Sequence, residues 1–191
     1  MKYRFHLYDK QLYIEMKKMK KIKNKGILFW ITGLSGSGKT QMAKKISKQI
    51  SKYYGPTIYF SGDDLRNIFD LKKYTKEARL SVAIKFRKFY KYVIAQNINV
   101  IYAVIGMFDS IREWNRKNIP NYVEIYIKSD IKKIIKIGKK RTYKDFKTNI
   151  IGLDIKPELP KSPNIIIENN FKKNIAQLSS ELLKKIKSTI Q

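Results

Sequence analysis

The sequence predicts an α/β fold of three layers, in which helices cover both faces of a parallel β-sheet. Short apolar runs alternate along the chain with longer segments of helical period, which is the pattern of repeated β-α units. The runs are rich in β-branched residues, as expected for strands that are buried on both faces. A length of 191 residues, 43% of them hydrophobic, is enough for one domain with a full core.

The elements can be assigned in chain order. Strands are expected at residues 27–31, 56–60, 100–105, 123–127 and 164–167. Helices are expected at residues 39–53, 65–69, 75–96, 110–117, 130–137 and 172–190. In the longest central helix, apolar residues recur at spacings of three and four and so share one face, which we expect to pack in the core. These residues are Ala78, Val82, Phe86, Phe89 and Val93.

Two segments do not fit the alternation. Residues 1–25 are polar and basic, and we interpret them as an N-terminal extension to a domain that spans residues 26–191. Residues 138–161 are basic and carry prolines, which indicates an irregular loop that could cover a site.

The composition excludes several kinds of active site. The chain has no Cys and a single His, His6. Disulfides, thiolate nucleophiles, His-cluster metal sites and Ser-His-Asp triads are therefore ruled out. Any catalysis must depend on carboxylates, Lys, Arg, hydroxyl groups or a bound ion.

The net charge of +27 raises the question of nucleic-acid binding. Only 7 of the 42 basic residues are Arg, and Ile and Asn are also abundant, so an AT-rich coding bias explains the lysines as readily as a selected binding face. We expect a solvated surface that attracts anions generally and binds nucleic acid only non-specifically. No signal peptide is recognisable, and the longest apolar run, residues 100–108, is too short to cross a bilayer. These features predict a cytoplasmic protein without a membrane partner.

The strongest motif is G-x-x-x-x-G-K-[ST], which lies between a predicted strand and a predicted helix as this motif requires. Its residues are Gly33, Leu34, Ser35, Gly36, Ser37, Gly38, Lys39 and Thr40. Backbone N–H groups of such a loop surround a polyphosphate at the positive end of the helix dipole. We expect Lys39 to contact the β- and γ-phosphates of ATP and the Thr40 hydroxyl to ligate Mg²⁺. The sheet is then that of a P-loop NTPase.

A carboxylate pair and an arginine follow the second predicted strand. The carboxyl ends of parallel strands face the same crevice as the phosphate loop, so Asp63 should lie within reach of Mg²⁺ or of an acceptor hydroxyl that it could orient or deprotonate. Arg66 would offer an anion-binding fork to the acceptor. For Asp64 we favour the role of N-cap to the short helix at residues 65–69. The Asn-Lys-x-Asp motif of GTPases is absent.

With these residues in view, residues 26–167 resemble the adenylylsulfate (APS) kinases, which phosphorylate the 3′-hydroxyl of APS with ATP. Residues 31–40 nearly match the family's P-loop, 61–66 are similar to its D-G-D-N-x-R, 74–79 to its F-S-x-E-D-R, and 152–163 to its late G-I-D…E-x-P-x-x-P. The resemblance implies a sheet with strand order 2-3-1-4-5 and frequent dimerisation. It implies that Asp63 is the catalytic carboxylate, with Lys39 beside it. It also implies an acceptor site formed by Asp63, Arg66, Tyr74, Arg79, Ile105 and Gly152, in which Tyr74 stacks on the acceptor base.

The departures from the family pattern fall on the acceptor side. Ser61 replaces the first Asp of D-G-D-N, and Val82 replaces a substrate-binding Asn. Gly106 and Asp109 stand where the family has the Ser and the Arg of S-P-Y-R, and Ile150 stands where it has a second Phe. Asp109 thus places a negative charge where an anion-binding cation is expected, which should weaken acceptor binding unless another cation compensates.

Two compensating cations are available in the sequence. These are Arg112 and the lysines of residues 139–147. Together the departures suggest that the ATP site is intact and that the acceptor pocket has been rebuilt.

Three functions follow from these observations. The first is an ATP-dependent 3′-phosphotransferase that converts APS to PAPS and ADP. The second keeps the mechanism but acts on a cytidine diphosphoramidate or a similar nucleotide, because the segment from Met107 to Arg116 resembles a divergent branch of the family that is associated with surface-polysaccharide genes. The third is a basic nucleic-acid-binding protein that retains a relic P-loop.

Overall fold

The computed structural model describes residues 26–137 and 149–190 of the chain. Its five parallel strands are β1 (Leu28–Gly33), β2 (Thr57–Ser61), β3 (Asn99–Val104), β4 (Tyr122–Lys128) and β5 (Ile165–Glu168). They form one sheet in the order β2-β3-β1-β4-β5, as the sequence predicts. β1 lies in the centre, where Ile31 is paired with Ala103 of β3 on one side and Ile125 of β4 on the other.

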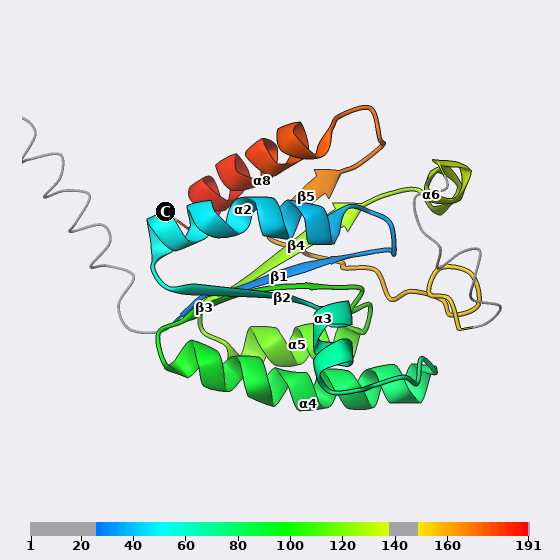
Figure 1. Ribbon diagram of the computed structural model, residues 1–191, viewed down its shortest axis with the longest axis horizontal. Coiled ribbons are helices and arrows are strands. Elements are labelled where there is room, and N and C mark those ends of the chain that lie inside the picture. The colour runs from blue at the N-terminus through cyan, green and yellow to red at the C-terminus, as the bar shows by residue number, and fades with distance from the viewer. Residues whose placement is uncertain (1–25, 138–148, 191) are drawn as a thin grey trace, which may run out of the picture.

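Helices cover both faces of the sheet (Figure 1). They are α2 (Lys39–Tyr54), α3 (Gly62–Ile68), α4 (Lys76–Ala95), α5 (Asp109–Asn118), α6 (Ile131–Ile137) and α8 (Ile175–Thr189). α2 and α8 lie side by side on one face, while α3, α4 and α5 lie on the other (Figure 1). The three-layer α/β prediction is confirmed, and most predicted strand and helix ends lie within two residues of the observed ones. The exceptions are the starts of α3 and α8, each of which differs by three residues.

The core has two halves because successive side chains of each strand point to opposite faces. Phe29 and Ile31 of β1 pack on α2 and α8, whereas Leu28 and Trp30 pack on α4 and α5. All six residues of β1 are buried. This double burial explains why the strand is one continuous apolar run rather than an alternating one.

The core-facing stripe of α4 differs from the prediction in its second half. Phe86, Tyr90 and Ile94 are the buried residues of this helix, whereas Phe89 is 38% exposed. Spacings of three and four both maintain a helical face, so the pattern alone allowed either phase. Tyr90 can be fully buried because its hydroxyl donates a hydrogen bond of 2.6 Å to Asn115 Oδ1.

Two predicted segments fall partly or wholly outside the described residues. Residues 1–25 and the lysines of 139–147 lie outside them. Residues 149–164, which we call the strap, run from a turn closed by the Ile151–Ile155 bridge to the start of β5. Within the described ranges, no helix is long and apolar enough to cross a membrane.

Candidate functional site

The phosphate loop connects β1 to α2, which begins at Lys39. Lys39 is buried, and its ammonium group donates a hydrogen bond of 2.9 Å to the carbonyl oxygen of Leu34 in the same loop. Ser35, Lys39 and Thr40 line a cavity of about 340 Å³ at the carboxyl ends of the central strands. The loop therefore presents both the Lys39 cation and the Thr40 hydroxyl to one cavity.

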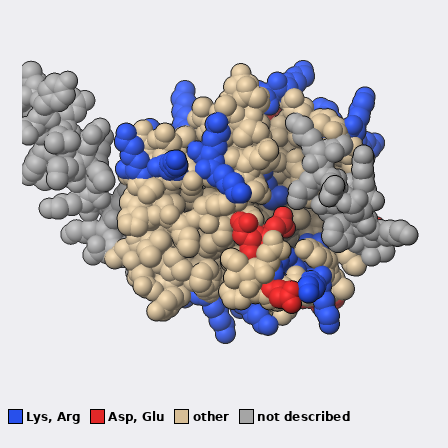
Figure 2. All heavy atoms as spheres, viewed as in Figure 1, with Lys and Arg blue, Asp and Glu red and all other residues tan. Residues whose placement is uncertain are grey.

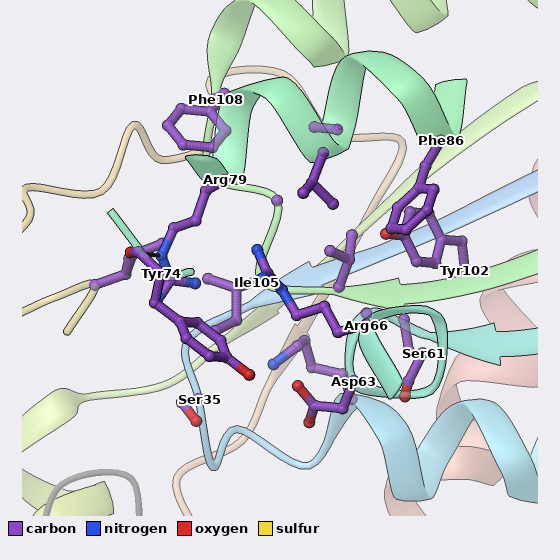
Figure 3. Close-up of a pocket in the computed structure, with 18 of the residues that line it drawn as sticks. Ser35, Ser61, Asp63, Arg66, Tyr74, Arg79, Phe86, Tyr102, Ile105 and Phe108 are labelled. Carbon is purple, nitrogen blue, oxygen red and sulfur yellow. Dashed lines mark hydrogen bonds between the residues drawn. The ribbon is translucent and has the colours of Figure 1, made fainter. Parts of the chain in front are cut away.

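The same cavity contains most of the residues predicted for the site (Figure 3). The predicted residues that line it are Ser35, Lys39, Thr40, Asp63, Arg66, Tyr74, Arg79 and Ile105. Gly33, Leu34, Gly36, Ser37 and Gly38 form the loop itself and are not part of the lining. Gly152 is also not part of it: a Cβ atom there would meet Ile131 at 2.7 Å and Leu34 at 3.2 Å, so this glycine packs behind the cavity wall.

The two carboxylates after β2, Asp63 and Asp64, have different environments. Ser61 is the N-cap of α3: its hydroxyl accepts a hydrogen bond from the Asp64 N–H at 3.1 Å, and the Asp64 carboxylate accepts one from the Ser61 N–H at 2.8 Å. Asp64 thus has the expected capping role, but as the third helical residue of a capping box rather than as the N-cap. The helix begins at Gly62 rather than at residue 65, because the sequence prediction did not recognise Ser61 as the cap. Asp63 lies between these partners with its side chain exposed to the cavity.

Two guanidinium groups and an aromatic ring also line the cavity. Nη1 of Arg66 donates to the carbonyl oxygens of Leu71 and Lys73 at 3.1 and 2.9 Å. The Arg66 and Arg79 guanidinium carbons lie 4.4 and 5.0 Å from the centre of the Tyr74 ring. Burial, followed by the charge of Arg66, lowers the pKa of Arg79. A guanidinium group whose pKa is lowered by burial and by a neighbouring like charge indicates a place where an anion would be stabilised.

Arg79 also fixes the edge of the strap. Its Nε donates to the carbonyl oxygen of Tyr74 at 2.8 Å and its Nη2 to that of Asn149 at 3.1 Å. Asn149, Ile150 and Ile151 line the cavity. Residues 149–151 of the predicted covering segment therefore do border the site.

Sequence reasoning missed a residue that supports the phosphate loop. Asn169 directly follows β5 and is buried, and its Nδ2 donates a hydrogen bond of 3.0 Å to the carbonyl oxygen of Ser37. Its Oδ1 accepts from the Phe171 N–H at 3.0 Å, which fixes the direction of the amide. The available signal was its place just beyond a strand end that faces the loop.

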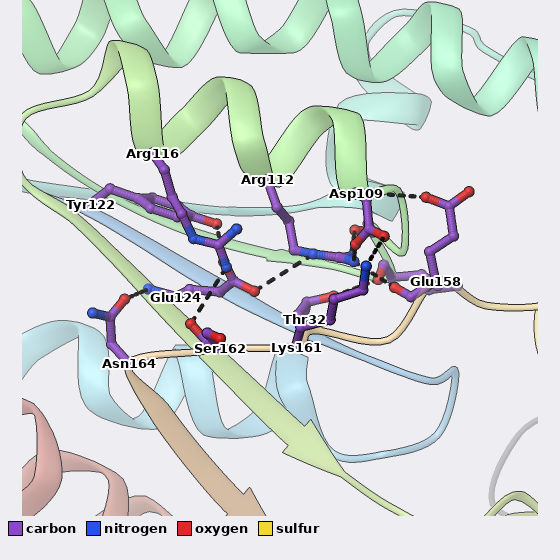
Figure 4. Close-up of polar contacts among 12 residues, drawn as sticks. Thr32, Asp109, Arg112, Arg116, Tyr122, Glu124, Glu158, Lys161, Ser162 and Asn164 are labelled. Atoms are coloured by element: carbon purple, nitrogen blue, oxygen red, sulfur yellow. Dashed lines mark hydrogen bonds and ion pairs between the residues drawn. The ribbon is translucent and has the colours of Figure 1, made fainter.

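The departures on the acceptor side fall in different environments. Ser61, Val82, Gly106 and Ile150 line the cavity, whereas Asp109 does not. Asp109 instead pairs with Arg112 and lies 3.8 Å from Lys161 (Figure 4). The expected charge reversal in the acceptor pocket is therefore absent from the described cavity.

Arg112 does not compensate for Asp109 inside the cavity. It is 1% exposed and does not line the cavity, because its guanidinium group is bound to Asp109 and to backbone carbonyl groups below α5. Arg112, one of the two cations that the sequence offered as compensation for Asp109, therefore neutralises Asp109 outside the cavity.

The residues present fit a magnesium nucleotide. Thr40 and Asp63 supply a hydroxyl and a carboxylate oxygen to the same cavity, and Mg²⁺ in such sites takes one or two protein oxygens together with phosphate oxygens. No cluster of three His, Cys, Asp or Glu side chains that could hold a metal by itself occurs among the residues described. Phosphate oxygens would therefore have to complete the coordination.

The basic side chains do not form a single surface patch on the face seen in Figure 2, where they lie in several separate groups. This distribution gives no support to a dedicated nucleic-acid groove on that face. Non-specific binding stays a prediction.

Comparison with known proteins adds the family context. Residues 25–168 match the family model of adenylylsulphate kinase. The chain is 33% identical over 169 residues to the cytidine diphosphoramidate kinase of Campylobacter jejuni, covering 86% of this chain and 99% of that protein. It is 30% identical over 156 residues to the adenylyl-sulfate kinase of Clostridium kluyveri, covering 76% of each. The Mycobacterium tuberculosis APS kinase in complex with AMPPNP and APS superposes with a TM-score of 0.74 at 20% identity, over 86% of this chain and 99% of that one, which shows the same fold.

Proposed function

This chain is a kinase of the adenylylsulphate kinase family, and we propose that it transfers the γ-phosphoryl group of ATP to the 3′-hydroxyl of a small nucleotide. The observation that carries the proposal is the shared cavity. Lys39 and Thr40 of the phosphate loop, the Asp63 carboxylate and two guanidinium groups line one space of about 340 Å³.

Each of these residues has a role that its position allows. Lys39 and the N-terminus of α2 would neutralise phosphate charge, and Thr40 with Asp63 would hold Mg²⁺. MgATP supplies the phosphoryl group when bound. Asp63 would orient the acceptor hydroxyl and receive its proton, and catalysis would otherwise consist of positioning and charge neutralisation.

The acceptor is expected to be anionic. Of the charged side chains that line the described cavity, Lys39, Arg66 and Arg79 are cationic and Asp63 is anionic. Arg66 and Arg79 are held in place by backbone carbonyl groups, so their charges face the cavity without the entropic cost of ordering long side chains. A nucleotide with a phosphate chain meets this requirement, and an uncharged sugar does not.

Two acceptors have specific support. APS is supported by the family match and by the Clostridium kluyveri relative. A cytidine diphosphoramidate is supported by the Campylobacter jejuni relative, 99% of whose length aligns with this chain. It is also supported by the cavity lining at Val82, Gly106 and Ile150, where the residues differ from the APS kinase pattern.

A coupled assay of ADP release with each acceptor tests the proposal. We expect Mg²⁺-dependent turnover with APS or with the cytidine nucleotide, and its loss in Lys39→Ala and Asp63→Asn. Lys45→Ala and Asp70→Asn are matched controls, because these residues are exposed and do not line the cavity. ADP release that is independent of every nucleotide acceptor would refute the proposal.

A further inference from the structure

The acceptor side of the cavity is walled by two irregular segments. One is the connection from β3 to α5, residues 105–108, which we call the acceptor loop; the other is the strap. They contribute Ile105, Gly106 and Phe108, and Asn149, Ile150 and Ile151, to the lining. Both segments lie within the described residues, and neither forms a helix or a strand of the sheet. Their separation therefore depends strongly on the side chains that connect them.

Arg112 connects the two segments directly. Its Nη1 donates to the carbonyl oxygen of Gly106 at 3.2 Å, and its Nη2 donates to the carbonyl oxygen of Glu158 at 2.6 Å. The same guanidinium group is paired with Asp109, the first residue of α5 (Figure 4). One planar group thus contacts the acceptor loop, the strap and the start of the helix that follows the loop.

Glu158 completes the connection from the side of the strap. Its Oε2 accepts a hydrogen bond of 2.6 Å from the Asp109 N–H, at a helix N-terminus that has no side-chain cap of its own. Its N–H donates to the carbonyl oxygen of Met107 at 3.3 Å. A carboxylate at this position satisfies a helix N–H group that would otherwise lack an intrahelical partner.

The Arg112 guanidinium group is also held by a buried carboxylate of β4. Arg112 Nε lies 3.6 Å from Oε1 of Glu124, a fully buried residue of β4 whose Oε2 accepts from Arg116 at 2.6 Å and from Tyr122 at 3.1 Å. Burial holds the pKa of Glu124 above its ordinary value, although Arg116, Tyr122 and Arg112 act in the opposite direction. A buried ion with several fixed partners has few alternative positions, so it can define a distance between the segments that it joins.

We propose that Arg112 and Glu158 are positioning residues that set the width of the acceptor side of the cavity, by holding the acceptor loop against the strap. Neither residue lines the cavity, and each acts through Gly106, Phe108 and Ile150. The inference rests on the proposed function for its kinetic readout. It also assigns a role to Asp109, which supports Arg112 instead of binding or repelling the acceptor.

The test uses Arg112→Lys and Glu158→Ala in the full chain. Lysine keeps the charge but lacks the planar fork that reaches three partners. We expect the KM for the acceptor to rise about 10-fold or more, while the KM for ATP and kcat change by less than about 2-fold, because a less rigid wall must be ordered when the acceptor binds and the phosphate loop is unchanged. Glu158→Gln keeps an oxygen acceptor for the Asp109 N–H and should restore much of the loss in Glu158→Ala.

Two control variants separate positioning from stability. Arg116→Lys disturbs the same buried Glu124 without a contact to the acceptor loop, although Arg116 also donates a 3.5 Å hydrogen bond to the carbonyl oxygen of Ser162 at the end of the strap. Glu168→Ala removes an exposed ion pair with Lys128. A second readout is hydrogen exchange without substrate, in which Arg112→Lys should accelerate exchange in residues 105–108 and 149–164 but not in the phosphate loop. Arg116→Lys should leave residues 105–108 and 149–158 protected and accelerate exchange only near Ser162.

The outcomes distinguish the inference from the function on which it rests. If the wild type phosphorylates neither APS nor the cytidine nucleotide, the proposed function fails. Hydrogen exchange in the two segments that is unchanged in Arg112→Lys would then also refute the positioning role of Arg112. If the wild type is active, the inference fails where the KM values for ATP and acceptor rise together. It also fails where Arg112→Lys lowers only the melting temperature, as Arg116→Lys would.

Discussion

Replacement of Gly106 by Ala probes the contact that shapes the acceptor loop. Gly106 has a φ of +45°, and a Cβ atom there would lie 2.6 Å from Cζ2 of Trp30 and 2.8 Å from Cγ1 of Val104. Real Cβ atoms do not approach other atoms this closely, so either the loop or the indole must move. A Ser at this position would meet the same contact, because it also carries a Cβ atom.

The indole is poorly placed to move. Trp30 is 1% exposed and packs edge-on against Tyr102 and Tyr90, with ring centres 5.2 and 5.9 Å away. Overpacking of a core typically costs about 1–3 kcal/mol, and a left-handed backbone conformation costs a residue with a Cβ about 1–2 kcal/mol. The sum is about 2–5 kcal/mol, which corresponds to a fall in melting temperature of about 4–20 °C for a chain of this size.

Gly55→Ala is a partial control. Gly55 has a φ of +96° and a ψ of −167°, with nothing within 4 Å of the added Cβ, so this substitution adds strain in a backbone region that is essentially restricted to Gly, without a contact. The contact with Trp30 at Gly106 is expected to contribute about 1–3 kcal/mol in urea or thermal unfolding. If Gly106→Ala unfolds at the wild-type midpoint, the assigned packing of the loop on the indole is wrong.

Three further predictions concern the phosphate loop, the helix cap and the surface charge. Asn169→Ala should raise the KM for ATP about 10-fold, as expected for the loss of a bond worth about 1.5 kcal/mol, and leave the KM for the acceptor unchanged; equal kinetics to Asn170→Ala would contradict this. Ser61→Ala should destabilise the protein by about 1 kcal/mol in urea unfolding through loss of the α3 cap, and an unchanged midpoint would show that the cap contributes nothing. Affinity for double-stranded DNA should fall along a steep log–log salt slope and be negligible near ~200 mM salt; binding that persists there would revive a specific nucleic-acid function.

Most of the fold could be predicted from the sequence because strands, helices and the phosphate loop are each indicated by neighbouring residues. Doubly buried strands such as β1 and β3 are continuous apolar runs, and the phosphate-loop motif locates the turn between the first strand and its helix. Strand order came from the family resemblance. The wrong phase in α4 shows the limit of periodicity, because Phe89 and Tyr90 both continue a spacing of three or four from Phe86. The burial of Tyr90 requires a partner for its hydroxyl, which Asn115 supplies from another helix.

The site was harder to predict from the sequence than the fold, because its supporting contacts join distant parts of the chain. Asn169 reaches Ser37 across 132 positions, and Arg112 reaches Glu158 across 46. The residues around Glu158 carry no pattern that predicts its partner, and the place of Asn169 after a predicted strand indicates only that it lies near the phosphate loop. Asp109 is the clearest case: its charge suggested a weakened acceptor site, yet the neighbouring Arg112 neutralises it outside the cavity.

The charged residues of the cavity indicate which of its residues could distinguish between the two candidate acceptors. APS and a cytidine diphosphoramidate both carry phosphate anions, so Arg66 and Arg79 would bind either of them and cannot discriminate. Discrimination must then arise where the cavity is apolar, at Val82, Phe108 and Ile150, against the base or the terminal group of the acceptor. A substitution such as Val82→Asn should therefore change the ratio of kcat/KM between the two acceptors, whereas Arg79→Lys should lower both values. If Arg79→Lys alters the ratio and Val82→Asn does not, selectivity resides in the charges and this division of the cavity is mistaken.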